Sequence, residues 1–190
     1  GGRGALEGNA QVTCDAEVRD RIWYNRCGQM KLFLVISDSH GDMGCLKRII
    51  DQYPFIGSII HLGDYCRDAV RLQNLYPDKE YYMVPGNCDF SVFGLSSEIT
   101  LEVEGLKVLV THGNRYGVKN GLGGLISHAE RKKYDVVLFG HTHVPLVRRT
   151  GRLLMVNPGS AGHPRGGINP TYALLEIGNG MAEARIMEVL

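Results

Sequence analysis

The chain carries its clearest structural signal at residues 30–40, which have the sequence MKLFLVISDSH. Residues 32–36 form an uninterrupted apolar run rich in Val, Ile and Phe, which predicts a buried β-strand. Asp38 and His40 follow the run at once and stand two residues apart. Both side chains can therefore reach one cation at the point where the strand ends. The segment predicts a strand that delivers metal ligands to the edge of a sheet.

Four further fragments repeat this arrangement of a short apolar run followed by polar donors. They are Gly63-Asp64, Gly86-Asn87-Cys88-Asp89, Thr111-His112-Gly113 and Gly140-His141-Thr142-His143. Strand ends in an α/β domain open toward one common edge, so ligands far apart in sequence can converge there. Asp89 aside, these fragments and the first one supply two Asp, one Asn and four His, enough for two divalent cations. The leading interpretation is a hydrolase with a dinuclear metal centre.

From Met30 onward the chain alternates strands and helices. The strands are predicted at 31–37, 58–61, 81–84, 99–103, 107–111, 136–139, 144–149, 153–156, 172–177 and 184–189. Helices are expected at 43–53, 69–76 and 122–133, where apolar residues recur at helical spacing. The order βαβαβ, then ββαβ, then four strands predicts two packed sheets with helices outside.

Residues 1–29 do not follow this pattern, because they are rich in turn-forming Gly and polar residues, and only residues 16–24 could form a short helix. We interpret residues 1–29 as an N-terminal extension that derives from the expression vector or from a misassigned start site. Residues 30–190 are expected to form a single domain. The functional alternative for the extension is a segment that caps the site or mediates association.

Composition excludes several classes of protein. With 190 residues, 44% of them hydrophobic and 22% charged, the chain is expected to be globular. A net charge of +1 gives no indication of a dominant basic face for nucleic acid. No apolar run approaches the roughly 18 residues that span a bilayer, and a secretory signal is not evident. Five scattered cysteines without a CxxC pair indicate reduced thiols and a cytoplasmic location.

The donor types indicate the chemistry of the centre. A carboxylate such as that of Asp64 has two oxygens and can bridge two cations about 3.5–4 Å apart. Carboxylate, amide and imidazole donors together suit Mn, Fe, Co, Ni or Zn better than Ca. The positive charge of two divalent cations exceeds the negative charge of two Asp and a bridging hydroxide. The centre would therefore keep a net positive charge and attract phosphate. Such cations also provide hydroxide near neutral pH, so no protein nucleophile is required.

In this order, the five fragments resemble the signature of calcineurin-like metallophosphoesterases: Asp-x-His, Gly-Asp, Gly-Asn-x-Asp, a His before Gly, and Gly-His-x-His. The Gly-Asn-Cys-Asp variant and the later Asn157-Pro158-Gly159-Ser160 look like the small prokaryotic YfcE-like phosphodiesterase branch. The resemblance covers residues 30–190. It implies a metallophosphoesterase-like α/β fold, a four-layer sandwich of two mixed β-sheets flanked by helices.

The resemblance also implies a role for each donor. Three residues would bind the first metal ion: Asp38, His40 and His143. Three would bind the second: Asn87, His112 and His141. Asp64 would bridge the two, and Asp64, Asn87 and His112 form the candidate catalytic set. The cofactor is expected to be two divalent ions, with Mn²⁺ favoured over Ni²⁺, Fe²⁺, Zn²⁺ or Mg²⁺.

Three further residues are candidates for supporting roles. Asp89 would restrain a ligand or its loop, and Arg165, like Arg67, could meet a substrate phosphate as a bidentate donor. Cys88 departs from many larger members of the superfamily, which have a His there that assists the leaving group. A thiol is a poor general acid, so protonation of the leaving group is unassigned. We therefore expect diesters with good leaving groups to react better than unactivated monoesters.

The remaining histidines are not predicted to bind metal. His61 belongs to a strand and is expected to be packed or to lie behind the ligands. His128 falls off the apolar stripe of its helix, so solvent exposure is expected. His163 either lines the pocket or is a plain loop residue.

The sequence thus predicts a metal-dependent phosphodiesterase that acts on a small phosphorylated substrate. A protein-binding scaffold is the alternative from another class, since the retromer scaffold subunit of eukaryotes resembles this fold. All seven predicted ligand positions carry competent donors, which favours catalysis. A nuclease is a third option, but the basic surface that guides DNA is not evident. A membrane partner is not expected, and a homo-oligomer is left open.

Overall fold

The computed structural model describes residues 30–90 and 94–189. The helix predicted at 16–24 lies outside the described residues, and the interpretation of residues 1–29 stays a prediction. Within the described ranges, ten strands form two five-stranded sheets.

The first sheet has the strand order β10-β9-β1-β2-β3. Its strands are β1 (Met30–Ile36), β2 (Ser58–His61), β3 (Glu80–Met83), β9 (Thr171–Gly178) and β10 (Met181–Glu188). β1, β2 and β3 run parallel, and the crossovers between them are α2 (Met43–Gln52) and α3 (Cys66–Leu75). β9 pairs antiparallel with both β1 and β10. The C-terminal hairpin therefore extends the sheet on the side of β1.

The second sheet has the strand order β4-β5-β6-β8-β7. Its strands are β4 (Glu98–Val103), β5 (Leu106–Thr111), β6 (Val136–Leu138), β7 (Leu146–Thr150) and β8 (Leu153–Asn157). β5, β6 and β8 run parallel, and the antiparallel strands β4 and β7 form the two edges. The connection from β5 to β6 contains two 3-10 turns, η1 (Asn114–Tyr116) and η2 (Val118–Asn120), followed by α4 (Gly123–Lys132).

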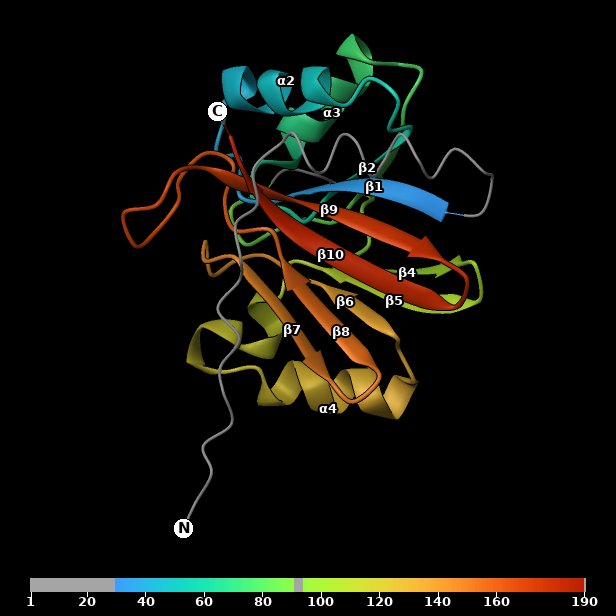
Figure 1. Cartoon of the computed structure of the whole chain (residues 1–190). Coiled ribbons are helices and arrows are strands. Elements are labelled where there is room, and N and C mark those ends of the chain that lie inside the picture. The colour runs from blue at the N-terminus through green and yellow to red at the C-terminus, as the bar shows by residue number, and fades with distance from the viewer. Residues whose placement is uncertain (1–29, 91–93, 190) are drawn as a thin grey trace.

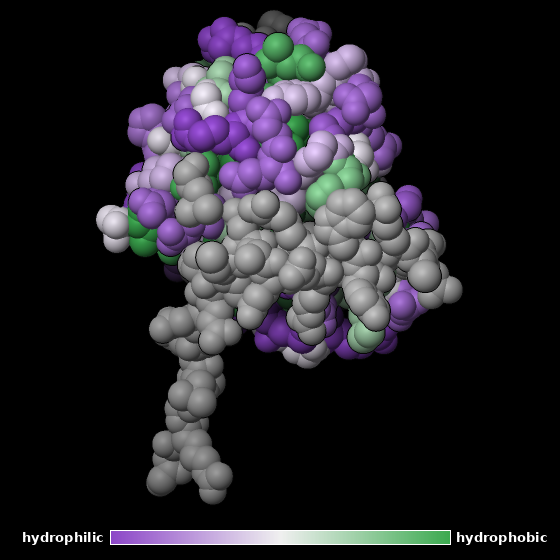
Figure 2. All heavy atoms as spheres, turned by 45° about the horizontal axis from the view of Figure 1, so that its top comes forward, coloured by the Kyte–Doolittle hydropathy of each residue, from purple (hydrophilic) through white to green (hydrophobic). Residues whose placement is uncertain are grey.

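Figure 1 shows four layers, in which α2 and α3 cover the outer face of the first sheet and α4 covers the outer face of the second. The predicted sandwich of two mixed sheets between helices is confirmed. In the view of Figure 2, the face that carries α2 and α3 is mostly hydrophilic, as expected for an outer layer. None of the helices in the described ranges is long and apolar enough to cross a membrane.

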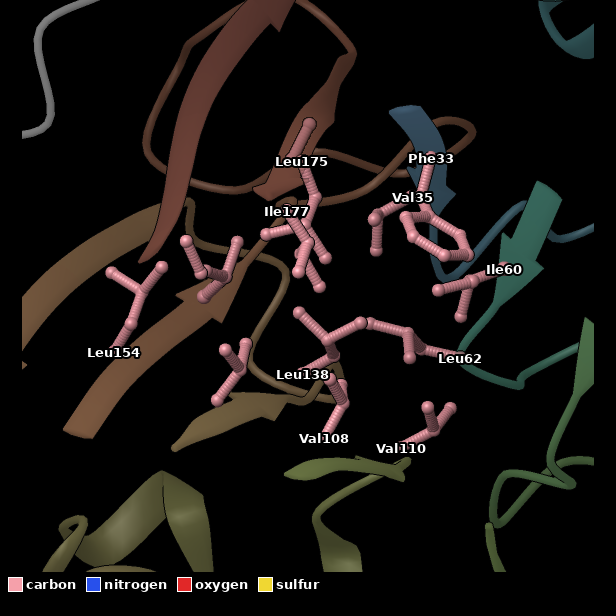
Figure 3. Packing of buried hydrophobic residues seen from close by; sticks show 14 of the residues in the cluster. Phe33, Val35, Ile60, Leu62, Val108, Val110, Leu138, Leu154, Leu175 and Ile177 are labelled. Carbon is pink, nitrogen blue, oxygen red and sulfur yellow. The ribbon is translucent and has the colours of Figure 1, made fainter. Parts of the chain in front are cut away.

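The apolar side chains form three layers of core, one between each pair of structural layers. The central core lies between the two sheets and is shown in Figure 3. Phe33 and Val35 of β1 point into this central core, whereas Leu34 and Ile36 pack in the core under α2 and α3. A strand buried on both faces needs apolar residues at every position. This requirement explains the unbroken apolar run that opens the domain.

Among the local differences from the sequence prediction, three have a clear physical cause. β7 begins at Leu146 instead of residue 144, because Pro145 has no N–H to donate to the neighbouring strand. α3 begins at Cys66, three residues before the predicted start, because the polar Arg67 and Asp68 conceal its first turn in the sequence. The two 3-10 turns before α4 were not predicted, since turns this short have little periodicity to detect.

The central core generates a stability prediction. Leu138 is fully buried there (0% exposed), so Leu138→Ala should lower the free energy of unfolding by about 2–5 kcal/mol, measured by denaturant titration. Leu75→Ala is the matched control, because Leu75 is 54% exposed. We expect the control to change stability by about 0.5 kcal/mol or less. Equal effects in the two variants would contradict the assignment of the central core.

Candidate metal centre

The first group of donors lies where β1, β2 and β6 end. Asp38, His40, Asp64 and His143 each offer a ligand atom, and these atoms all lie within 4.8 Å of one another. Nε2 of His143 is 3.1 Å from Oδ1 of Asp38, and Nε2 of His40 is 4.0 Å from Oδ2 of Asp64. The parallel strands thus bring residues more than 100 positions apart to one edge, as the sequence predicted.

The second group shares Asp64 with the first. Ligand atoms of Asp64, His112 and His141 also lie within 4.8 Å of one another. Nε2 of His112 is 3.5 Å from Oδ1 of Asp64 and 3.2 Å from Oδ1 of Asn87, so Asn87 borders this group. The structure therefore brings all seven predicted ligands together, in two groups joined by one carboxylate.

Backbone carbonyls orient two of the imidazoles. Nδ1 of His112 donates to the carbonyl oxygen of Leu62 at 2.7 Å, and Nδ1 of His143 donates to that of His163 at 2.6 Å. A carbonyl can only accept, so the proton must be on Nδ1 in both rings. In the neutral form of each ring, the lone pair of Nε2 can then bind a cation, an arrangement usual for metal-binding histidines.

Unpaired polar atoms test whether the residues fit a cation. Nε2 of His40 and Nδ1 of His141 are buried and have no hydrogen-bond partner among the described residues. Buried polar atoms without partners are rare and need an explanation. Both atoms belong to the two donor groups, whose mixture of nitrogen and oxygen suits transition-metal ions. The residues present therefore fit divalent metal ions.

Burial sets the charge of the donors. It lowers the pKa of His141 to about 4 and also lowers the pKa of His40, so both imidazoles are neutral at pH 7 and can act as ligands. For Asp38, burial raises the pKa, but the adjacent His143 and His112 side chains and the hydrogen bond from Oγ of Ser37 together outweigh that effect. The pKa of Asp38 is therefore held below its ordinary value, and the carboxylate stays ionised.

Five of the seven predicted ligands have a left-handed backbone that non-glycine residues rarely adopt. They are Asp38 (φ 53°), His40 (φ 47°), Asp64 (φ 54°), His141 (φ 68°) and His143 (φ 60°). Such conformations cost about 1–3 kcal/mol each and tend to gather at functional sites. The backbone conformations are an observation separate from the five sequence fragments, and they single out the same residues.

Two glycines give the ligands room. A Cβ atom on Gly86 would collide with Oδ1 and the backbone nitrogen of Asp64, and one on Gly140 would collide with Oγ of Ser37. The collision at Gly86 includes a backbone atom, so a side-chain movement cannot relieve it, whereas the collision at Gly140 would displace the side chains of Ser37 and Asp38. The Gly in each Gly-x motif is therefore needed because backbone and ligand approach so closely.

Asp89 ties the loops of the centre together. Its Oδ1 accepts hydrogen bonds from the backbone N–H groups of Tyr65 (3.0 Å) and Cys66 (2.8 Å) at the start of α3. Its Oδ2 accepts from the N–H of Gly86 at 2.9 Å. The side chain thus joins the loop after β2 to the loop after β3. This geometry agrees with the predicted role of restraining a ligand loop, which stays a prediction.

Cys88 and Arg165 lie beside the donors. The backbone N–H of Cys88 donates to Oδ1 of Asp64 at 2.8 Å. Burial and the nearby Asp64 carboxylate raise the pKa of the Cys88 thiol to about 11, so it stays protonated at neutral pH. The N–H of Arg165 donates to the carbonyl oxygen of His143 at 3.3 Å, while its side chain is exposed to solvent. Arg165 is therefore anchored next to the first donor group.

The other histidines have distinct environments. His61 is buried, as expected, and its Nδ1 accepts from the N–H of Gly63 at 3.2 Å. His163 is exposed, and its ring centre lies 5.0 Å from that of His40. The expectation that His128 is solvent-exposed is wrong. It is half-buried, with its ring centre 5.1 Å from that of Tyr116, because η1 folds back onto α4.

Ser39 and Asp68 also belong to this region, although neither was predicted as a site residue. Asp68 is fully buried, and its Oδ2 accepts hydrogen bonds from Oγ of Ser39 at 2.7 Å and from the N–H of Gly41 at 2.8 Å. A signal was present, because Asp68 stands four residues before the buried Leu72 and so shares the apolar face of α3. A carboxylate on the buried face of a helix requires polar partners.

Comparison with known proteins agrees with this geometry. Residues 30–180 match the calcineurin-like phosphoesterase superfamily domain, and the chain therefore belongs to this superfamily. Among curated relatives, a probable metallophosphoesterase, YsnB of Bacillus subtilis (strain 168), is 36% identical over 157 residues. That match covers 82% of this chain and 89% of YsnB. Phosphodiesterase YfcE of Escherichia coli (strain K12) is 27% identical, covering 77% of this chain and 88% of YfcE. The family resemblance predicted from the sequence is confirmed.

Solved structures share the fold. A predicted phosphoesterase from Streptococcus pneumoniae TIGR4 is similar with a TM-score of 0.72 at 29% identity, covering 86% of this chain and 95% of that chain. Vacuolar protein sorting 29 from Cryptosporidium parvum is similar with a TM-score of 0.66 at 19% identity, covering 84% and 97%. At this low identity the second likeness shows the fold alone.

The contact between Gly86 and Asp64 generates a prediction about metal binding. Gly86→Ala should displace Asp64 and weaken Mn²⁺ binding, measured by calorimetry on metal-stripped protein, by on the order of 10-fold or more. Gly57→Ala is the control, because a Cβ on Gly57 meets nothing within 4 Å and Gly57 has no positive φ. Unchanged Mn²⁺ affinity in a folded Gly86→Ala protein would contradict the steric argument.

Proposed function

We propose that this phosphoesterase-family chain is a metal-dependent phosphodiesterase that uses two divalent cations. The observation that carries the proposal is the sharing of Asp64 between two donor groups. Two adjacent cations require a carboxylate that can bridge them, with different ligands near each of its two oxygens. The names of the curated relatives support a phosphoesterase in general, and the phosphodiesterase assignment rests on the likeness to YfcE.

In this proposal each cation has its own set of residues. Asp38, His40 and His143 hold the first cation, and Asn87, His112 and His141 hold the second. Asp64 serves both. When bound, the cations supply Lewis-acid stabilisation of the phosphate oxygens and acidify water, so that a nucleophile forms near neutral pH. Mn²⁺ is the favoured ion, because nitrogen and oxygen donors are mixed in nearly equal number.

Other side chains would bind and orient the phosphate. Arg165 is anchored to His143 through its backbone and has an exposed guanidinium that can approach a bound phosphate. The Arg67 guanidinium lies 5.5 Å above the ring of Tyr65, whose centre is 5.1 Å from that of His40. We propose that these arginines donate paired hydrogen bonds to substrate oxygens. Asn87 is itself exposed, so its amide can contact both the centre and the substrate.

A binding scaffold is the competing function, because the structures of vacuolar protein sorting 29 have the same fold. Binding to another protein does not require neutral imidazoles, an ionised Asp38 or unpaired nitrogen atoms aimed at a common point. Their presence here favours catalysis. A nuclease is less well supported, because the net charge of +1 provides no general attraction for a polyanion.

The proposal extends to the substrate class and to the location of the reaction. We propose that the substrate is a small phosphodiester and that the reaction takes place in the cytoplasm. Cys45, Cys66 and Cys88, the cysteines within the described residues, are all free thiols. Reduced cysteines are usual in that compartment.

Loss of the shared carboxylate should abolish the reaction. In metal-stripped protein re-supplied with Mn²⁺, Mg²⁺, Ni²⁺ or Zn²⁺, turnover of a bis-aryl phosphate should return with at least one ion. Asp64→Ala and His112→Ala should reduce kcat/KM by on the order of 1000-fold or more, because the nucleophile and charge stabilisation both depend on the cations. His128→Ala is the matched control, since His128 packs on Tyr116 away from the centre. Full activity in both centre variants would eliminate the mechanism.

The thiol at Cys88 leads to a prediction about leaving groups. Without an assigned general acid, the rate should fall steeply across a series of aryl phosphodiesters as the pKa of the leaving phenol rises. The measurement is kcat/KM for each ester at one pH, with a mono-aryl phosphate for comparison. Cys88→His should make this dependence shallower by supplying an acid. A preference for poor leaving groups in the unmodified protein would refute this expectation.

A further inference from the structure

Asp68 faces the loop that follows β1, although it belongs to the first turn of α3. Its carboxylate is completely buried. One oxygen, Oδ2, accepts hydrogen bonds from Oγ of Ser39 at 2.7 Å and from the N–H of Gly41 at 2.8 Å. These two donors stand immediately before and immediately after His40. Asp68 therefore holds both neighbours of a predicted metal ligand.

His40 needs this support because its backbone is strained. Its φ of 47° lies in the left-handed region, which non-glycine residues rarely adopt. In this conformation Nε2 of His40 is buried, has no hydrogen-bond partner and lies 4.0 Å from Oδ2 of Asp64. The bonds to Asp68 stabilise the backbone that aims the imidazole at the first donor group.

His61 extends the support to the next ligand loop. Its Nδ1 accepts from the N–H of Gly63 at 3.2 Å, so in the neutral ring Nε2 carries the proton and donates to Oγ of Ser39 at 3.1 Å. The Ser39 hydroxyl in turn donates to Asp68. The donated hydrogen bonds therefore run from Gly63 through His61 and Ser39 to Asp68. They link the residue before Asp64 to the residue before His40.

Asp68 is not needed to cap α3, because Asp89 already accepts from the N–H groups of Tyr65 and Cys66 at the start of this helix. Its other oxygen, Oδ1, has no hydrogen bond and is 3.8 Å from Nη1 of Arg71. A buried carboxylate is unfavourable unless its partners are well placed. Among the described residues, both hydrogen bonds that this carboxylate accepts come from the loop that contains His40.

We propose that Asp68 is a positioning residue that sets the affinity of the cation site formed by Asp38, His40, Asp64 and His143. It acts through Ser39 and Gly41, and it does not contact the cation. This inference rests on the proposed metal centre. The second donor group, with His112 and His141, has no residue in the loop that Asp68 holds.

The test is Mn²⁺ binding to the metal-stripped full chain, followed by calorimetry and by elemental analysis of the metal retained. The unmodified protein should bind two Mn²⁺ ions. Asp68→Ala should weaken one site by about 10–100-fold and leave the other within about 2-fold, since loss of a residue behind a ligand has effects of this size. His40→Ala should weaken the same site. The double variant Asp68→Ala/His40→Ala should bind Mn²⁺ at the other, unaffected site as tightly as His40→Ala does alone.

Asp42→Ala is the matched control. Asp42 lies in the same loop and accepts from the N–H of Cys45 at 2.8 Å as the N-cap of α2, so its loss costs stability without releasing His40. It should lower the melting temperature and keep both Mn²⁺ sites. A purely structural role for Asp68 would give this same pattern and would overturn the proposal.

Two milder variants keep the test decisive if Asp68→Ala does not fold. Asp68→Asn retains an acceptor oxygen but removes the charge, and Ser39→Ala removes one of the two donors. Each should weaken the same single site, by less than His40→Ala does. Two unaltered sites in both variants would refute the role of Asp68 and leave the metal centre intact. Absence of Mn²⁺ binding in the unmodified protein would instead refute the proposed function.

Discussion

The close contact between the loop after β2 and the loop after β3 is the constraint on which the whole centre depends. A Cβ on Gly63 would be 2.5 Å from the backbone nitrogen of Gly86, and a Cβ on Gly86 would overlap Asp64. The two glycines therefore face each other with no space for a side chain. This contact brings the Asp64 carboxylate against the N–H of Cys88 and fixes it between the two donor groups. Neither group would be complete with Asp64 elsewhere.

The centre is locally unfavourable and is held in place by the rest of the domain. Strained backbones, buried carboxylates and unpaired imidazole nitrogens all raise its free energy in the absence of cations. Three layers of apolar core compensate, and the strands of both sheets fix where each loop begins. The carboxylates of Asp68 and Asp89 add specific bonds between loops. The scaffold thus keeps the donors close together, and bound cations would relieve their unfavourable interactions.

Much of this could be predicted from the sequence. Apolar runs that end in Asp, Asn or His located the strands and the seven donors, because strand period and ligand chemistry are both local properties. The pairing of β1 with β9 could not be predicted, since it depends on contacts between residues more than 130 positions apart. Asp68 was missed because the polar first turn of α3 conceals the helix start. His128 was misjudged because the fold of η1 over α4 leaves no periodic signal.

The pairing of β1 with β9 also determines when the centre can form during synthesis. The carbonyl of Asp38 accepts from Oγ of Ser160, and the N–H of Ala161 donates to the carbonyl of Ser37. The first predicted metal-binding motif to leave the ribosome is thus held by a residue 122 positions further along the chain. A nascent chain carries exposed donors and an unpaired β1 edge until its C-terminal hairpin emerges. Capture of cations by the proposed centre would therefore have to wait until residues 160–178 have been synthesised.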